Sequence, residues 1–359
     1  MHIYINNFNY IHKYISIYIN TIIIYPSITI ILFRLEKNKN MKATYDDNNN
    51  NNNNKNVVNK NNKKVNNNNV NINSAYKRFQ SAVSLERLNT KSGHLISYYD
   101  YGPKSKDMPP LVCIHGIASN PGIFFKQIVS LAARGYRVLS FSLPIVYDQQ
   151  VCTNILNECL DQLKLYMTVH IWGCGLGGFI AQLFAVRFPR RIESLILTNT
   201  FCDTSYYYNS IGGGFMPVSS ITWMPLSILK GMILKDIESG INVNSKKNDS
   251  NVMESIDFIL DKLELTTNQE TLASRITLNS IHTKIGALKA IEHEKISLLD
   301  TLDRSAVSLE LSNQLCTLYP NCKQAFLKDG GDFPQLSRCD EITMHLLVHL
   351  RRWDPKSST

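Results

Sequence analysis

A glycine-rich run in the middle of the chain has the spacing of a turn that presents a catalytic nucleophile. A short apolar segment of the strand type, residues 169–172, leads into Gly173-Cys174-Gly175-Leu176-Gly177-Gly178, and a helical pattern follows. In hydrolases with a G-x-S-x-G motif, the nucleophile stands on a sharp turn between strand and helix, and small neighbours let the backbone pass. The glycines match this motif, but its centre is Gly175, which has no side chain to attack a substrate.

Two other interpretations of this run are less favoured. The glycines that end at Gly178 also match G-x-G-x-x-G, but a dinucleotide site needs an acidic residue about 20 positions on, after the next strand. The next strand pattern, residues 194–200, is neutral and leads to Phe201, so we expect no nucleotide and no cofactor. Cys174 precedes the centre of the turn, where a side chain points into strand packing, and we interpret it as a buried structural thiol.

The other two positions of a catalytic triad can be located by pattern. Asp303 follows a predicted strand where a G-x-x-D motif supplies the acid, and Asp332 stands where a glycine is followed by the catalytic histidine. An aspartate is a poor base at neutral pH, and a second aspartate nearby would repel it. The loop His115-Gly116-Ile117 keeps the shape of an oxyanion-hole loop. The sequence therefore predicts a scaffold for anion stabilisation without an attacking group or its base.

The remaining histidines and the cysteines give no alternative centre. His282, His293, His345 and His349 are possible relocated bases, but a surface or helix-face histidine is the simpler interpretation of each. His345 and His349 have a metal-binding i, i+4 spacing without an evident third ligand, so we predict no metal. The eight cysteines contain no C-x-x-C pair. Buried free thiols in a reducing compartment, the cytoplasm, are expected.

The elements around these residues alternate between strand and helix. Mostly apolar strands that alternate with helices predict a parallel sheet covered on both faces, opened by an antiparallel hairpin. About ninety residues then interrupt the alternation, and the amphipathic segment 252–263 within them predicts a helical cap, at about 204–293, inserted after the sixth strand. The predicted strands are residues 82–88, 94–101, 110–115, 137–143, 169–174, 194–200, 295–299 and 324–328.

The first 75 residues differ from the rest in composition. Through Gln80, eleven basic and three acidic side chains carry +8 of the net charge of +9, so the body is nearly neutral and has no electrostatic footprint for nucleic acid. We predict a disordered, Asn-rich extension over 1–75 and one folded domain over 76–359. The Ile-, Asn-, Tyr- and Lys-rich residues 1–40 indicate a spurious upstream translation; a membrane anchor in the uncharged run 14–33 is the alternative.

Residues 76–353 resemble the maspardin family, which lies within the α/β-hydrolase superfamily. The resemblance rests on six runs: IFFKQI (123–128), GYRV (135–138), FCDTS (201–205), SRITLN (274–279), LYPN (318–321) and GGDFP (330–334). It implies an α/β-hydrolase fold and a cytoplasmic protein that works through protein partners and associates peripherally with endosomal or trans-Golgi membranes. Family members typically keep a serine at the turn yet lack the histidine. In this sequence Gly175 also replaces the serine, so it departs further from the pattern of an active enzyme.

Three functions of different classes are compatible with these patterns. The favoured hypothesis is a catalytically inactive hydrolase-fold protein that acts as a protein-binding adaptor or regulator, because both Gly175 and Asp332 replace the residues that do the chemistry. The alternatives are an esterase or lipase with a rearranged site, and a receptor that uses the empty pocket for a lipid or acyl ligand.

Overall fold

The computed structural model describes residues 71–211, 217–244, 249–304 and 306–353. The chain divides into two units, Met1–Asn68 and Asn69–Thr359, and the described residues all belong to the second. The predictions for residues 1–40, and for almost all of the Asn-rich extension, therefore lie outside the described residues. Among the helices that are described, none combines the length and the apolar character needed to cross a bilayer.

The core is a sheet of eight strands in the order β1-β2-β4-β3-β5-β6-β7-β8, as predicted for an α/β-hydrolase fold. The pairs β1–β2 and β2–β4 are antiparallel, and all others are parallel. The strands are β1 (Glu86–Asn89), β2 (Leu95–Tyr101), β3 (Leu111–Ile114), β4 (Val138–Phe141), β5 (Val169–Cys174), β6 (Ile192–Thr198), β7 (Ile296–Thr301) and β8 (Lys323–Leu327). Every residue of β3, β4, β5 and β7 is buried, because helices cover both faces.

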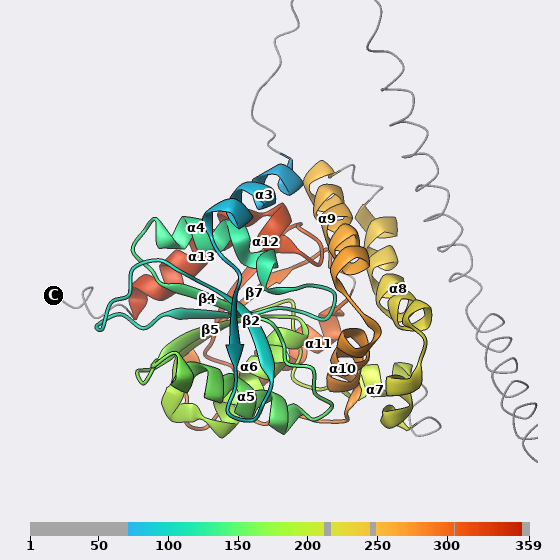
Figure 1. The fold of residues 1–359 in the computed structure, drawn as a ribbon, viewed down its shortest axis with the longest axis horizontal. Coiled ribbons are helices and arrows are strands. Elements are labelled where there is room, and N and C mark those ends of the chain that lie inside the picture. Colours follow the sequence, from blue (N-terminus) through green and yellow to red (C-terminus); the bar gives the residue numbers. More distant parts are fainter. Residues whose placement is uncertain (1–70, 212–216, 245–248, 305, 354–359) are drawn as a thin grey trace, which may run out of the picture. The chain divides into compact units, whose positions relative to one another are not determined.

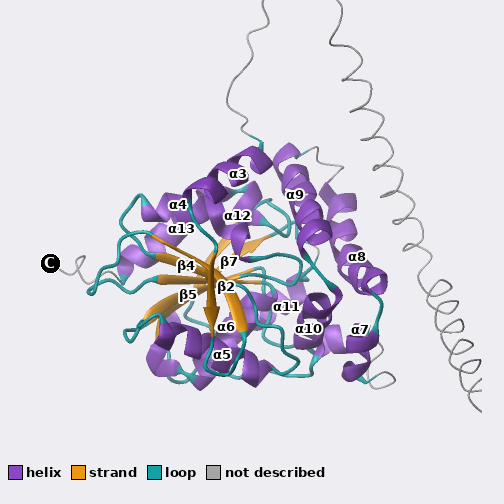
Figure 2. Cartoon of the chain, in the orientation of Figure 1, coloured by secondary structure: helices purple, strands orange, loops and turns teal. Residues whose placement is uncertain are grey.

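Helices pack on the two faces in separate groups (Figures 1 and 2). One face carries α4 (Phe125–Ala132) and α13 (Cys339–Arg352), together with the short α12 (Pro334–Ser337). The other face carries α5 (Gln149–Gln162), α6 (Leu176–Arg187) and α11 (Leu309–Leu318), whose buried side chains share one apolar cluster with the sheet. This arrangement confirms the predicted sheet covered on both faces.

The start of the domain differs from the sequence prediction. A helix, α3 (Ile72–Ala82), precedes the sheet, and β1 begins at Glu86, so residue 82 does not start a strand. Tyr76 and Phe79 are buried against Phe125 and Phe258, and these contacts stabilise a segment whose own sequence has weak helix propensity. The folded domain therefore begins at about residue 71, slightly before the predicted boundary at 76.

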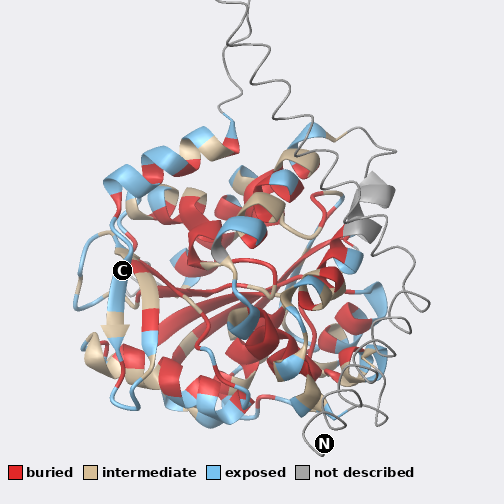
Figure 3. Cartoon of the chain, turned by 45° about the vertical axis from the view of Figure 1, so that its right-hand side comes forward, coloured by how far each residue is buried: buried red, intermediate tan, exposed pale blue. Residues whose placement is uncertain are grey.

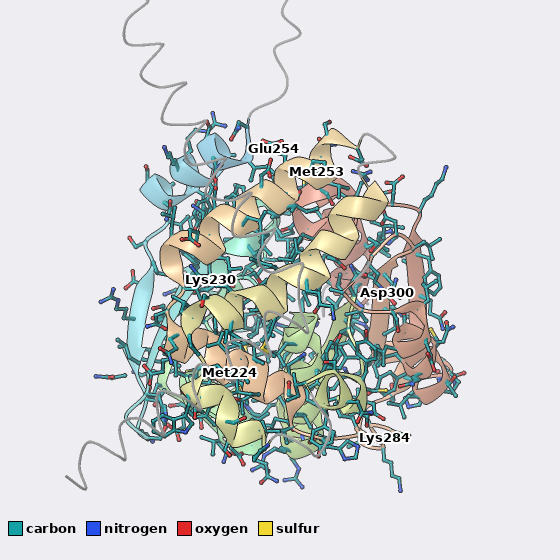
Figure 4. The ribbon with its side chains drawn as sticks, turned by 90° about the vertical axis from the view of Figure 1, so that its right-hand side faces the viewer. Met224, Lys230, Met253, Glu254, Lys284 and Asp300 are labelled. Atoms are coloured by element: carbon teal, nitrogen blue, oxygen red, sulfur yellow. The ribbon has the colours of Figure 1, made fainter. Side chains whose placement is uncertain are left out.

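A helical cap follows β6, as predicted, and occupies one end of the sheet (Figure 1). It contains α7 (Ser205–Ser210), the 3-10 helix η3 (Val218–Trp223), α8 (Leu226–Asn244), α9 (Ser250–Thr266) and α10 (Gln269–Ser280). Helices α8 and α9 lie side by side (Figure 4), joined by an ion pair of 2.7 Å between Lys230 Nζ and Glu264 Oε2. Helix α9 also reaches α3, because Glu254 Oε1 accepts the amide hydrogen of Ile72.

The sheet and the helix faces that meet it form a buried interior (Figure 3). Every cysteine is a free thiol, and five of the eight are buried, which confirms the prediction of free thiols. Helix α10 is unusual for a cap helix, because all nine residues from Leu272 to Ser280 are buried, polar side chains included. It lies between the outer cap helix α8 and the loops at the carboxyl ends of the strands.

Candidate functional site

The glycine-rich run forms a sharp turn between β5 and α6. Gly175 has φ +53° and ψ −123°, a conformation that a residue with a side chain rarely adopts. Its N–H donates to the carbonyl of Thr198 at 3.1 Å, and its carbonyl accepts from Thr200 Oγ1 at 2.6 Å. These bonds tie the turn to the end of β6 and hold Gly175 in its positive-φ conformation, which glycine adopts without strain.

Close backbone contacts leave no room for a side chain at Gly173 and Gly177, whereas the space around Gly175 is open. A Cβ atom added to Gly177 would lie 2.1 Å from the carbonyl oxygen of Ile114, and one added to Gly173 would lie 2.5 Å from Gly178 Cα. A Cβ atom added to Gly175 would find its nearest neighbour, Gly116 Cα, at 3.9 Å. The turn therefore has room for a side chain at its centre, and Gly175 is partly exposed there.

The loop after β3 lies against this turn. His115 is fully buried, and its Nε2 accepts the amide hydrogen of Leu143 at 3.2 Å, so its proton is on Nδ1, which donates to the carbonyl of Gly116 at 2.8 Å. Burial, and then the charge of Arg275, lower the pKa of His115 to about 3. His115 is therefore neutral and supports the loop. Both ring nitrogens of His115 are engaged in these hydrogen bonds.

The backbone amides of Ile117 and Leu176, on either side of this contact, have no hydrogen-bond partner among the described residues. Leu176 directly follows the centre of the turn, and Ile117 belongs to the loop after β3. These are the positions from which hydrolases of this architecture donate to a developing oxyanion. One of these amides lies in the loop His115-Gly116-Ile117, for which the sequence predicts the shape of an oxyanion-hole loop.

Asp303 and Asp332 lie in adjoining loops after β7 and β8. Asp303 is buried, and its Oδ1 accepts the amide hydrogen of Gly331 at 2.8 Å; Asp332 Oδ1 accepts that of Ala306 at 2.9 Å. Partial desolvation, and then the charge of Asp332, raise the pKa of Asp236 on cap helix α8, although its side chain keeps an exposed edge. The loops after β7 and β8 and the cap helix α8 thus each contribute a carboxylate to this region.

Asn199 connects these loops, although no sequence motif marks it. It follows β6 with φ +44°, and its Nδ2 donates to Thr301 Oγ1 at 3.0 Å and to the carbonyl of Gly331 at 3.1 Å. Its own carbonyl oxygen lies 4.0 Å from a Cβ atom added to Gly175. The sequence offered one signal, an asparagine directly after a buried strand, because asparagine tolerates positive φ. Through Asn199, the turn at Gly175 adjoins the loops of Asp303 and Asp332.

The other candidate bases lie elsewhere. His349 is buried, with Nδ1 at 2.6 Å from Ser297 Oγ and Nε2 at 2.7 Å from Ser194 Oγ, near the amino ends of β6 and β7. The rings of His282 and His293 pack beside Tyr208 and Tyr319 respectively. His345, on α13, is half-buried.

Cys174 is buried, and burial raises the pKa of its thiol well above the ordinary value, although a hydrogen bond with Thr198 opposes the shift. The reactive thiolate is therefore disfavoured. Over the described ranges, no three His, Cys, Asp or Glu side chains are grouped as a metal site requires.

Comparisons with known proteins agree with this architecture. A family model of the α/β hydrolase fold matches residues 109–211. Maspardin of Danio rerio is 34% identical over 289 residues, which cover 79% of this chain and 88% of that protein. Maspardin of Homo sapiens is 33% identical over 285 residues, covering 78% and 88%.

Solved structures show the same fold at low sequence identity. A hydrolase from Pseudomonas aeruginosa superposes with a TM-score of 0.58 at 17% identity, covering 74% of this chain and 98% of that one. A putative lipase from Acinetobacter baumannii gives a TM-score of 0.57 at 21% identity, covering 81% and 99%. These likenesses establish the fold alone.

Proposed function

The chain belongs to the maspardin family within the α/β-hydrolase superfamily, and from that premise we propose that it is a non-catalytic, protein-binding adaptor or regulator. The observation that carries the proposal is the turn at Gly175. Its backbone has the positive φ of a turn that exposes a nucleophile, and its surroundings leave room for a side chain. The residue at that place has none, so no covalent attack can start there.

The position of the base supports the same conclusion. A serine hydrolase needs an imidazole to take the proton of the nucleophile and a carboxylate to orient that imidazole. Asp332 occupies the position where the sequence pattern predicts the imidazole, and it lies in the loop that adjoins that of Asp303. Two carboxylates repel one another, and neither replaces an imidazole at neutral pH. His115 is the histidine beside the turn, and its nitrogens are both engaged.

A protein that keeps this fold without its chemistry retains surfaces and a cap that can bind other molecules. We propose that the chain acts in the cytoplasm through protein partners, with peripheral association at endosomal or trans-Golgi membranes. Support for this part comes from the family resemblance. The near-neutral charge of the body favours protein partners over nucleic acid.

The catalytic half of the proposal is tested by reaction of the purified full-length protein with a serine-directed fluorophosphonate probe. We expect no stoichiometric labelling. Saturable labelling of one serine, with esterase activity lost in parallel, would make the protein an esterase with a rearranged site. The matched control is heat-denatured protein, which reports non-specific reaction.

The adaptor half is tested by capture of the tagged full chain from cells, followed by reconstitution with the purified candidate. We expect at least one partner to bind in both settings, with an unchanged affinity in the presence of the fluorophosphonate. Failure of every captured protein to bind the purified chain directly would contradict an adaptor role.

A further inference from the structure

The cap helix α10 buries an arginine, Arg275, whose charge no described carboxylate neutralises. Arg275 is 6% exposed; its Nη1 donates to the carbonyl oxygen of Ile117 at 3.1 Å, and its Nε is buried without a hydrogen-bond partner. No carboxylate among the described residues lies within ion-pair distance of it. By contrast, the buried Arg304 lies 3.6 Å from Asp300. An unpaired buried charge is costly, so the arrangement calls for a counter-ion.

The guanidinium lies at the site already described. Within the described part of the chain it bonds to the carbonyl of Ile117 alone, and the amide of Ile117 is a free donor beside the turn. The second free donor, Leu176, is the first residue of α6, a helix of 12 residues whose N-terminal end carries partial positive charge. Gly175 borders these donors; it is partly exposed, and an added Cβ atom would find no neighbour closer than 3.9 Å there.

Hydrogen bonds from the body of the domain fix helix α10, and with it the position of Arg275. The amide of Val146 donates to Ser274 Oγ at 2.9 Å, and Ser274 Oγ donates back to the carbonyl of Val146 at 2.6 Å. Gln149 Nε2 donates to the carbonyl of Leu278 at 2.8 Å. Because these bonds join the helix to the loop after β4 and to α5, the guanidinium is held in place before any ligand arrives, which lowers the entropic cost of binding.

We propose that the guanidinium of Arg275 and the backbone amides of Ile117 and Leu176 bind the carboxylate of a small organic acid. The planar fork of an arginine matches a carboxylate, and charge-assisted hydrogen bonds of this kind are the strong ones. The single positive charge of the Arg275 guanidinium balances the single negative charge of one carboxylate. A phosphate dianion would leave a negative charge near the loops of Asp303 and Asp332, which border the other side of the turn.

Arg275 remains a cation at neutral pH. Burial lowers its pKa to about 10, which still leaves it protonated at pH 7. The inference goes beyond the proposed adaptor role, because the ligand would occupy the site whether or not a protein partner is bound. Its failure would also leave the absence of catalysis untouched.

The test measures the binding of three probes to the full-length protein by calorimetry and thermal shift: hexanoate, hexan-1-ol and inorganic phosphate. We expect hexanoate to bind and to raise the melting temperature. Hexan-1-ol keeps the apolar tail but lacks the charge, so its affinity should be lower by about 10- to 100-fold, the range for a charge-assisted hydrogen bond. Inorganic phosphate should also bind more weakly than hexanoate.

Two variants separate the site from general effects. Arg275→Gln should weaken hexanoate binding by a similar factor and leave hexan-1-ol binding unchanged, whereas Arg190→Gln, a control at an exposed arginine, should change neither. Equal affinity for hexanoate and hexan-1-ol, or no hexanoate binding, would overturn the proposal. Tighter binding of phosphate would overturn the assignment to a carboxylate. If Arg275→Gln does not fold, the affinities of hexanoate and hexan-1-ol for the unmodified protein still decide whether the site binds a carboxylate.

Discussion

The side-chain amide of Asn199 donates a hydrogen bond of 3.1 Å to the carbonyl oxygen of Gly331, and this bond joins the loop after β6 to the loop after β8. The same side chain accepts the amide hydrogen of Thr301 through Oδ1 at 2.9 Å, and the backbone N–H of Asn199 donates to Asp300 Oδ1 at 2.8 Å. Asn199 thus holds together the loops at the carboxyl edge of the sheet, including those that carry Asp303 and Asp332.

Replacement of Asn199 with alanine should therefore destabilise the domain strongly. Asn199→Ala leaves the amide of Thr301 and the carbonyl of Gly331 buried without this partner, and places alanine at φ +44°. We expect the free energy of unfolding to fall by about 2–4 kcal/mol in urea titrations. Asn313→Ala, on the exposed side of α11, is the control and should change it by less than about 0.5 kcal/mol. Equal effects of the two would contradict the role of Asn199.

Two glycines of the same turn should respond very differently to serine. Gly175→Ser meets no close contact and costs only the strain of its positive φ, so we expect a loss of about 1 kcal/mol. Gly177→Ser would place Cβ 2.1 Å from the carbonyl of Ile114, a backbone atom that cannot move aside, and should cost at least about 3 kcal/mol or prevent folding. Thermal melting of both variants checks the difference. No loss for Gly175→Ser would contradict the strained turn.

The sequence predicted the turn and the sheet well, for a physical reason. Strands buried on both faces are continuous apolar runs, so the strand Val169–Cys174 was predicted with its observed bounds. Gly173 and Gly177 are fixed by backbone contacts, the first within the turn and the second with the end of β3. Such local requirements leave a signature in the spacing of residues.

What the sequence did not reveal depends on contacts between distant segments. Arg275 is 158 positions from Ile117, and Asn199 is 132 positions from Gly331. No periodicity relates these pairs, and the run that contains Arg275 was noted only as part of the family resemblance. Helix α3 was missed for the same reason, since its stability comes from packing against α4 and α9.

The docking of α3 leads to a prediction about Tyr76. Its ring centroid lies 5.4 Å from that of Phe125 and 5.2 Å from that of Phe258, and Lys262 Nζ lies 4.7 Å above it. Tyr76→Ala should therefore lower the free energy of unfolding by about 3–5 kcal/mol in denaturant titrations. Tyr166→Ala is the matched control, because Tyr166 is 72% exposed, and should cost less than about 0.5 kcal/mol. A small effect at Tyr76 would place α3 outside the stable domain.

Two buried histidines predict that the domain loses stability in mild acid. Burial lowers the pKa of His115 and of His349 to about 3, with added effects of Arg275 on the first and of His170, Arg352 and Lys323 on the second. An unfolded histidine titrates near pH 6.5. The folded state therefore binds fewer protons between about pH 6.5 and 3, and stability is complete above this window and falls as the pH is lowered through it.

The size of this effect can be checked with one variant. Each histidine should cost about 2 kcal/mol of unfolding free energy between pH 7.5 and pH 5. His349→Gln should remove roughly half of the combined loss, whereas His345→Gln, on the same helix but half-buried, should leave it unchanged. Urea titrations at the two pH values measure both. An unaltered pH dependence in His349→Gln would contradict the assignment.

Restoring both missing groups should restore chemistry that neither restores alone. Gly175→Ser supplies an attacking oxygen in a turn that has room for it, but without a base the hydroxyl stays protonated and weakly nucleophilic. Asp332→His supplies an imidazole in the loop next to Asp303, which is already held by the amide of Gly331. We expect the double variant to hydrolyse p-nitrophenyl butyrate at least about 100-fold faster than either single variant, the usual contribution of a positioned base. Activity in Gly175→Ser alone would show that another base reaches the turn, and the assignment of Asp332 to the imidazole position would then be wrong.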